Sequence, residues 1–96
     1  MPTSYEVTYI LRPTLEEEAI ETKITQFSDV VAGLKGEVGA IERMGKRRLA
    51  YEIDDTREGF YVVMQFKSTA DAAKELDRQM GLSEDVMRAL LLKLDS

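Results

Sequence analysis

Apolar residues recur at every second position in some segments of this chain and at every third or fourth position in others. Residues 5–11 follow a period of two, which predicts a strand with Tyr5, Val7, Tyr9 and Leu11 on one face. Residues 15–34 follow a period near 3.6, which predicts an amphipathic helix. We expect Thr14 and Glu17 to form a capping box that starts this helix at Leu15, and residues 33–36 to end it.

The middle of the chain predicts a long antiparallel hairpin. An extended segment begins at Glu37, and Arg43, Gly45 and Arg47 lie in the same phase as its apolar residues. A charged side chain that faces a core carries a large desolvation cost, so we expect this stretch to project beyond the core or to bulge at Gly45. Residues 54–59 have turn chemistry, and residues 60–67 alternate again as the returning strand.

A second helix and a last strand complete the pattern. Residues 68–71 have cap chemistry, Leu76 and Met80 lie on one stripe, and Gly81 is well placed to end the helix. Residues 86–94 are apolar in both phases, which favours a strand, although a short helix also fits. The order β-α-β-β-α-β predicts one α+β domain over residues 1–96. Its fold is ferredoxin-like, with a four-stranded antiparallel sheet and two helices on one face.

Composition excludes several classes of site. The 96 residues include no His and no Cys, so a zinc site or a Cys/His nucleophile lacks its ligands or its base. The glutamates of residues 16–21 are explained by the positive end of a helix dipole. From the residues we therefore expect no zinc site, no Cys/His nucleophile and no hard-cation site at these glutamates. We find no secretory signal or membrane-spanning run in the sequence, and cytoplasmic localisation is the expectation.

Positive charge is concentrated at Arg43, Lys46, Arg47 and Arg48, although the net charge of the chain is −5. A basic patch on an acidic background predicts a local contact with phosphates or with an acidic partner. A charged strand that discourages edge aggregation fits the same residues. Alternate residues of a strand point to opposite faces, so Arg47 cannot share a surface with Lys46 and Arg48 unless the strand twists or bulges.

Further candidate residues lie in the last strand and on the predicted open face of the sheet. Leu90 and Leu92 share a phase with Arg88, and Ala89 and Leu91 lie in the other phase. A sheet that is covered on one side would leave about half of these side chains exposed, unless a neighbouring loop or the chain termini shield the second face. An exposed apolar patch of this kind is typical of an interface. Tyr51 and Tyr61 are candidates for a partner-facing surface or for stacking on bases.

The residues from Gly45 to Ile53 and from Arg57 to Tyr61 resemble the bacterial small-subunit ribosomal protein S-six family. The likeness covers nearly the whole chain and includes residues 5–7, 36–38, 74–78 and 85–88. One departure is Met44, where the family commonly carries Trp. A methionine can fill an apolar gap between partners, but it does not stack as Trp does.

The resemblance implies a non-enzymatic component of the small ribosomal subunit, without metal or cofactor. It also implies binding to the central domain of small-subunit rRNA together with ribosomal protein S-eighteen, in the cytoplasm, with neither DNA nor a membrane as partner. The expected RNA-binding residues are Arg43, Lys46, Arg47, Arg48, Arg88 and Lys93. The expected partner-binding residues are Met44, Tyr51, Tyr61, Leu90 and Leu92.

Two other functions fit the same fold. A small-molecule-binding regulatory module that dimerises through its sheet edges would account for the fold and the acidic charge, but it leaves the basic residues 43–48 without a role. An enzyme that resembles acylphosphatase would need an arginine and an asparagine to position water, and this chain has no asparagine.

Overall fold

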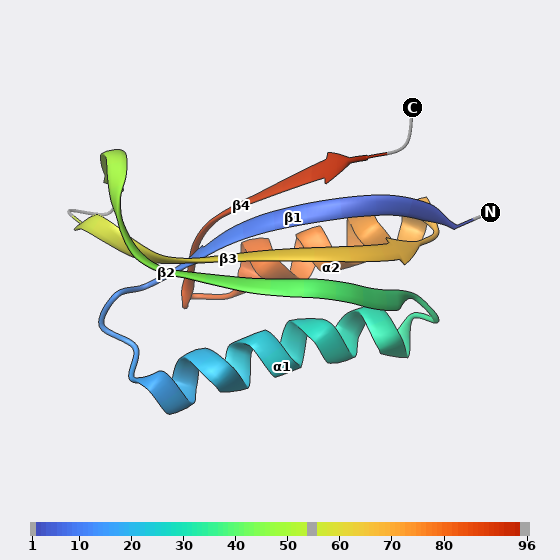
Figure 1. The fold of residues 1–96 in the computed structure, drawn as a ribbon, viewed down its shortest axis with the longest axis horizontal. Helices are drawn as coiled ribbons and strands as arrows, with labels where there is room; N and C mark the ends of the chain where they lie inside the picture. The colour runs from blue at the N-terminus through green and yellow to red at the C-terminus, as the bar shows by residue number, and fades with distance from the viewer. Residues whose placement is uncertain (1, 54–55, 95–96) are drawn as a thin grey trace.

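The computed structural model describes residues 2–53 and 56–94 and has the predicted order of elements (Figure 1). These elements are β1 (Thr3–Leu11), α1 (Glu17–Gly33), β2 (Glu37–Ile53), β3 (Thr56–Ser68), α2 (Ala70–Leu82) and β4 (Val86–Lys93). The strands form one antiparallel sheet in the order β2-β3-β1-β4. The predicted ferredoxin-like α+β fold is therefore confirmed, and residues 86–93 form a strand and not a short helix.

The core lies between one face of the sheet and the two helices. Alternate residues of the central strand β1 are buried there, as its period of two predicts: Tyr5, Val7, Tyr9 and Leu11. Helix α1 contributes Phe27, whose ring meets the Tyr9 ring edge-on at a centroid distance of 5.3 Å. Since α1 and α2 both pack on this face, neither helix of residues 2–53 and 56–94 covers the opposite face, which is available for other contacts.

Helix α1 begins at Glu17, so the predicted start at Leu15 with a Thr14 capping box is wrong. Glu16 is the N-cap residue, and its side chain makes no capping hydrogen bond. Leu15 packs against the core instead, and its amide donates to the Arg12 carbonyl at 3.2 Å in a turn. Complete burial of a leucine stabilises a fold by roughly 1.5–3 kcal/mol and a cap contributes about 1 kcal/mol, so even the partial burial of Leu15 offsets the loss of the Thr14 cap.

The other predicted boundaries differ by a few residues at most. Helix α1 ends at Gly33 as expected, and Lys35 follows with a φ of 67°. Helix α2 ends at Leu82, one residue beyond Gly81. Strand β3 begins at Thr56 and not at Phe60, because residues 56–59 pair with β2. The turn expected from Asp54 and Asp55 lies outside the described residues.

Substitution of the α2 cap should lower the free energy of unfolding. The Thr69 side chain accepts a hydrogen bond from the Ala72 amide at 3.2 Å, as the cap chemistry predicts. We expect Thr69→Ala to cost about 1 kcal/mol in chemical denaturation, because an amide at the helix start loses its acceptor. Thr14→Ala is the matched control and should leave the unfolding free energy nearly unchanged. Equal costs at the two threonines would contradict this account of helix capping.

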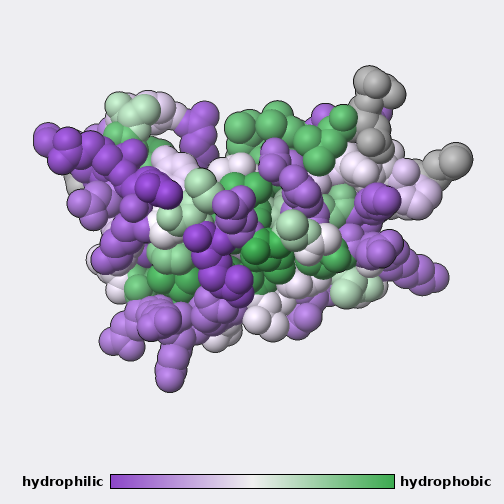
Figure 2. Space-filling model, in the orientation of Figure 1, coloured by the Kyte–Doolittle hydropathy of each residue, from purple (hydrophilic) through white to green (hydrophobic). Residues whose placement is uncertain are grey.

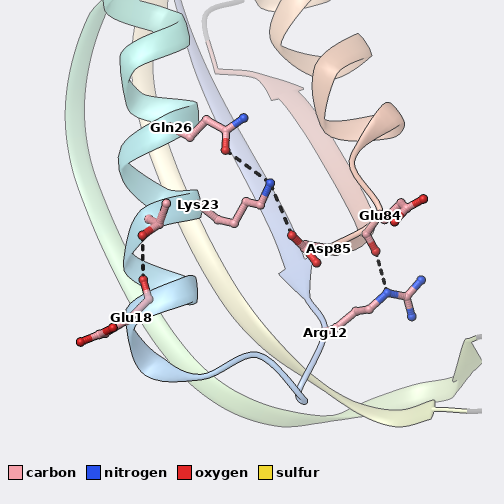
Figure 3. Close-up of polar contacts among 7 residues, drawn as sticks. Arg12, Glu18, Lys23, Gln26, Glu84 and Asp85 are labelled. Carbon is pink, nitrogen blue, oxygen red and sulfur yellow. Dashed lines mark hydrogen bonds and ion pairs between the residues drawn. The ribbon is translucent and has the colours of Figure 1, made fainter.

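Polar contacts join the connection between β1 and α1 to the connection between α2 and β4 (Figure 3). The Arg12 Nε donates to the Glu84 carbonyl at 2.6 Å, and the Arg12 amide donates to the Asp85 carbonyl at 3.0 Å. The Lys23 Nζ lies 3.4 Å from the Asp85 carboxylate and 3.3 Å from the Gln26 side-chain oxygen. These contacts hold the start of β4 beside the end of β1, where the candidate interface lies.

Candidate nucleic-acid interface

Strands β2 and β3 continue beyond the end of β1 and form a projecting hairpin (Figure 1). Strand β1 pairs with β3 only as far as Phe60, which lies opposite Leu11. We call residues 46–53 of β2 and 56–59 of β3 the basic hairpin. The predicted bulge precedes it: the register shifts between Arg43 and Gly45, and Gly45 has a φ of 85°. Glycine adopts this left-handed conformation without strain, so Gly45 allows the chain to change direction at the base of the hairpin.

The cations of the basic hairpin divide between two faces, as predicted from their spacing. Directly opposed residues of an antiparallel pair project to the same face. Arg47 lies opposite Gly59, next to the open face, whereas Lys46 lies opposite Phe60, which packs against the core. Arg48 is two residues beyond Lys46 and therefore projects to the same face as Lys46. All three are exposed, and none forms an ion pair with any residue in the described ranges.

Arg43 differs from these three cations because it already has a partner. It lies opposite the buried Val62, and its Nε and Nη2 donate to the two carboxylate oxygens of Glu21 at 2.7 and 2.8 Å. These hydrogen bonds lower the pKa of Glu21 and raise the pKa of Arg43. The buried Tyr9 hydroxyl is close enough to respond to both charges, although burial is the main reason that its pKa is raised.

A groove of about 300 Å³ lies on the open face, where the far end of β2 folds back over β1 and β4. Tyr51, Tyr61, Arg88 and Leu90 line it together with Ile10 and other residues of β1 and β2. The Arg88 guanidinium carbon lies 5.5 Å from the centre of the Tyr51 ring, which is a cation–π distance. The groove therefore combines apolar walls with one positive charge.

The apolar surface continues from the groove along β4. Leu90, Leu92 and Leu94 expose 53, 46 and 48% of their surface, while Ala89 and Leu91 pack against the core. Figure 2 shows this hydrophobic surface at the top of the molecule, and it shows hydrophilic surface at the hairpin end on the left. About half of the apolar side chains of β4 are thus exposed, as predicted for a sheet with one helical layer, and the exposed phase is that of Leu90 and Leu92.

The structure brings together some of the predicted site residues and separates others. Tyr51, Tyr61, Arg88 and Leu90 share the groove, and Leu92 follows on the same face of β4. Met44 lies at the bulge with 38% of its surface exposed, outside the groove lining. Lys93 is exposed at the end of β4 and lies opposite Tyr5. Its side chain projects to the opposite face of the sheet from Leu90 and Leu92.

Sequence reasoning missed two groups of residues. Ile10 and Leu49 pack on the open face beneath the hairpin and are only 7 and 8% exposed. Ile10 gave a signal, because it is apolar in the phase of Glu6 and Thr8, which face away from the core. Glu21 is the other missed residue, because the sequence pattern explains it as a helix-dipole charge. Arg43 could have indicated its role, because a cation in the core-facing phase of a strand needs an acidic partner nearby.

Residues 2–53 and 56–94 contain no cluster of three or more His, Cys, Asp or Glu residues that could hold a metal ion. Neither of the helices in these ranges has the length and apolar character needed to cross a membrane.

Comparison with known proteins agrees with the fold. The family model described as Ribosomal protein S6 matches residues 4–93. This chain belongs to the ribosomal protein S6 family. The small ribosomal subunit protein bS6 of Carboxydothermus hydrogenoformans is 48% identical over 95 residues, which is 99% of each chain. The bS6 protein of Desulfitobacterium hafniense strain DCB-2 is 46% identical over 94% of this chain and 95% of its own length.

The S6 fold is also seen in a solved structure. The crystal structure of 30S ribosomal protein S6 from Thermotoga maritima aligns with a TM-score of 0.91 and 28% identity, covering 97% of this chain and 88% of that one. The expectations of a small-subunit ribosomal protein that is not an enzyme are therefore confirmed, since S6 is a non-enzymatic ribosomal family. Membership of this family favours the ribosomal function over the alternative of a small-molecule-binding regulatory module.

Proposed function

We propose that this S6 family protein binds the central domain of small-subunit rRNA together with ribosomal protein S-eighteen. The observation that carries the proposal is the basic hairpin, where three exposed cations without an ion-pair partner in the described ranges project from an acidic protein. When exposed, unpaired cations of a protein neutralise phosphates, the counterions condensed on the RNA are released, and this release favours binding. Lys46, Arg47 and Arg48 are the proposed phosphate contacts; they lie on two faces, and RNA can reach both because the hairpin projects beyond the end of β1 (Figure 1). Arg88 and Lys93 are proposed as secondary contacts from β4.

A net charge of −5 means that the rest of the protein does not attract RNA. A few phosphate contacts alone give weak binding, roughly micromolar or weaker at physiological salt. Specific assembly therefore needs a second protein that shares the RNA and the interface. Its binding and the binding of the RNA are then coupled, so that each raises the affinity of the other by the same factor.

The surface proposed for S-eighteen is the open-face groove with the adjoining leucines of β4. Tyr51, Tyr61 and Leu90 line or border the groove, and Leu92 extends it. The outer edge of β2 is a poorer docking site, because the register of β2 shifts at three places and these irregularities disrupt strand addition. Met44 lies near one of these shifts and is proposed as a peripheral contact.

The test is binding of a central-domain RNA fragment to this protein, alone and with purified S-eighteen, across a salt titration. We expect weak binding alone, tighter binding with S-eighteen, and a logarithm of the affinity that falls linearly with the logarithm of salt concentration. Binding of S-eighteen without RNA is measured in parallel by calorimetry. RNA affinity that does not change when S-eighteen is added would contradict the proposal.

A further inference from the structure

Glu21 and Arg43 form a closed ion pair beside the base of the basic hairpin. Both Glu21 carboxylate oxygens accept a hydrogen bond from the Arg43 guanidinium, at 2.7 and 2.8 Å. Such a bidentate pair is the strongest arrangement that these two side chains can form. Its net charge is zero, so the pair as a whole gives an approaching phosphate little attraction. Arg43 is in this respect unlike Lys46, Arg47 and Arg48, which have no such partner in the described ranges.

The surroundings of Arg43 also disfavour phosphate. Arg43 projects toward α1, on the side of Val62, and the bulge at Gly45 separates it from the hairpin. Exposed acidic residues of α1 lie along the same helix, with Glu17 and Glu18 one turn before Glu21. A phosphate that displaced the Glu21 carboxylate would leave it unpaired and would meet its negative charge at close range.

We infer that Glu21 withholds Arg43 from RNA and ends the RNA-binding surface at the bulge. Arg43 is then a structural cation that joins β2 to α1, and phosphate contact begins with Lys46. This inference rests on the proposed RNA binding of the basic hairpin and names the residue that limits its extent. It replaces the expectation from sequence that Arg43 binds RNA with the others.

The test is a salt titration of RNA affinity for four proteins: wild type, Arg43→Gln, Glu21→Gln and the double variant. The probe is a central-domain small-subunit RNA fragment in the presence of S-eighteen. Arg43→Gln should leave the slope of log affinity against log salt unchanged. Glu21→Gln frees one cation, so it should steepen the slope by about 0.7–0.9 and raise affinity about threefold to fivefold at physiological salt. The double variant should return to the wild-type slope.

Glu18→Gln is the matched control, because it removes the same charge from the same helix. Its carboxylate forms no ion pair in the described ranges, so it should change affinity by less than Glu21→Gln and leave the slope unchanged. Circular dichroism and thermal unfolding establish that each variant is folded. Glutamine keeps an oxygen acceptor for Arg43, which favours retention of the fold.

The outcomes separate this inference from the proposed function. If Arg43→Gln flattens the slope as Arg47→Gln does, Arg43 binds RNA and the inference is wrong while the proposed function stands. The inference is also wrong if Glu21→Gln and Glu18→Gln act alike. If neither Lys46→Gln nor Arg47→Gln changes RNA binding, the proposed function of the hairpin fails, and the inference fails with it.

Discussion

Simultaneous replacement of Lys46, Arg47 and Arg48 by glutamine should lower the affinity for a central-domain RNA fragment about 100-fold at physiological salt. Each cation that meets a phosphate contributes about 0.7–0.9 to the slope of log affinity against log salt, so the loss of three should flatten this slope by about 2.1–2.7. The side chains are exposed and have no ion-pair partner in the described ranges, so the fold should be retained. Filter binding or fluorescence anisotropy across a salt series measures both quantities.

A charge-matched variant separates local contact from net charge. Lys35, Lys67 and Lys74 are exposed and lie outside the basic hairpin, so their replacement by glutamine removes the same three charges. This variant should lose far less affinity, because its charges are lost at a distance from the proposed phosphate contacts and are screened by salt. Similar losses in the two triple variants would mean that general electrostatics, and not the basic hairpin, governs RNA binding.

Much of this fold could be predicted because local pattern and tertiary burial agree. In β1, the side chains of Tyr9 and Leu11 project to the helical face and are fully buried. In β4, the side chains of Leu90 and Leu92 project to the open face and are exposed. The bulge at Gly45 was predictable for a physical reason, since Arg43 and Arg47 could not both face a packed core. The high free-energy cost of burying a charged side chain thus predicted a bulge that the spacing of apolar residues alone does not predict.

The features that sequence reasoning missed depend on contacts between distant elements. The pairing of Glu21 with Arg43 joins residues that are 22 positions apart, and it appears only when α1 is packed beside β2. The groove forms because Leu49 of the hairpin folds back toward Ile10, near Gly59. A side chain at position 59 would collide with Ile10, so glycine is required there for close packing and not for turn chemistry. No local pattern specifies such an approach.

Replacement of Leu90 and Leu92 by glutamine should weaken binding to S-eighteen about 100-fold without destabilising the protein. Each leucine is about half exposed, so its remaining burial in an interface is worth roughly 1 kcal/mol. A buried glutamine amide without a partner costs a further 1–3 kcal/mol or so. For the two positions together, the lost burial amounts to roughly 2 kcal/mol and the amides add at least about 1 kcal/mol, so the total is about 3 kcal/mol or more, which corresponds to at least roughly a 100-fold change in the dissociation constant. Calorimetric titration of S-eighteen into the double variant measures it.

The choice of glutamine makes this result specific to the apolar surface. Net charge is unchanged, so the salt dependence of RNA binding by this protein alone should match wild type, and only the gain on addition of S-eighteen should be lost. Leu82→Gln is the control, because Leu82 is 70% exposed but lies at the end of α2, away from the open face. If Leu82→Gln weakens binding to S-eighteen as much as the β4 variant does, the docking surface lies on the helical side. If neither variant has an effect, the partner does not dock on the β4 leucines, and the proposed docking surface is wrong.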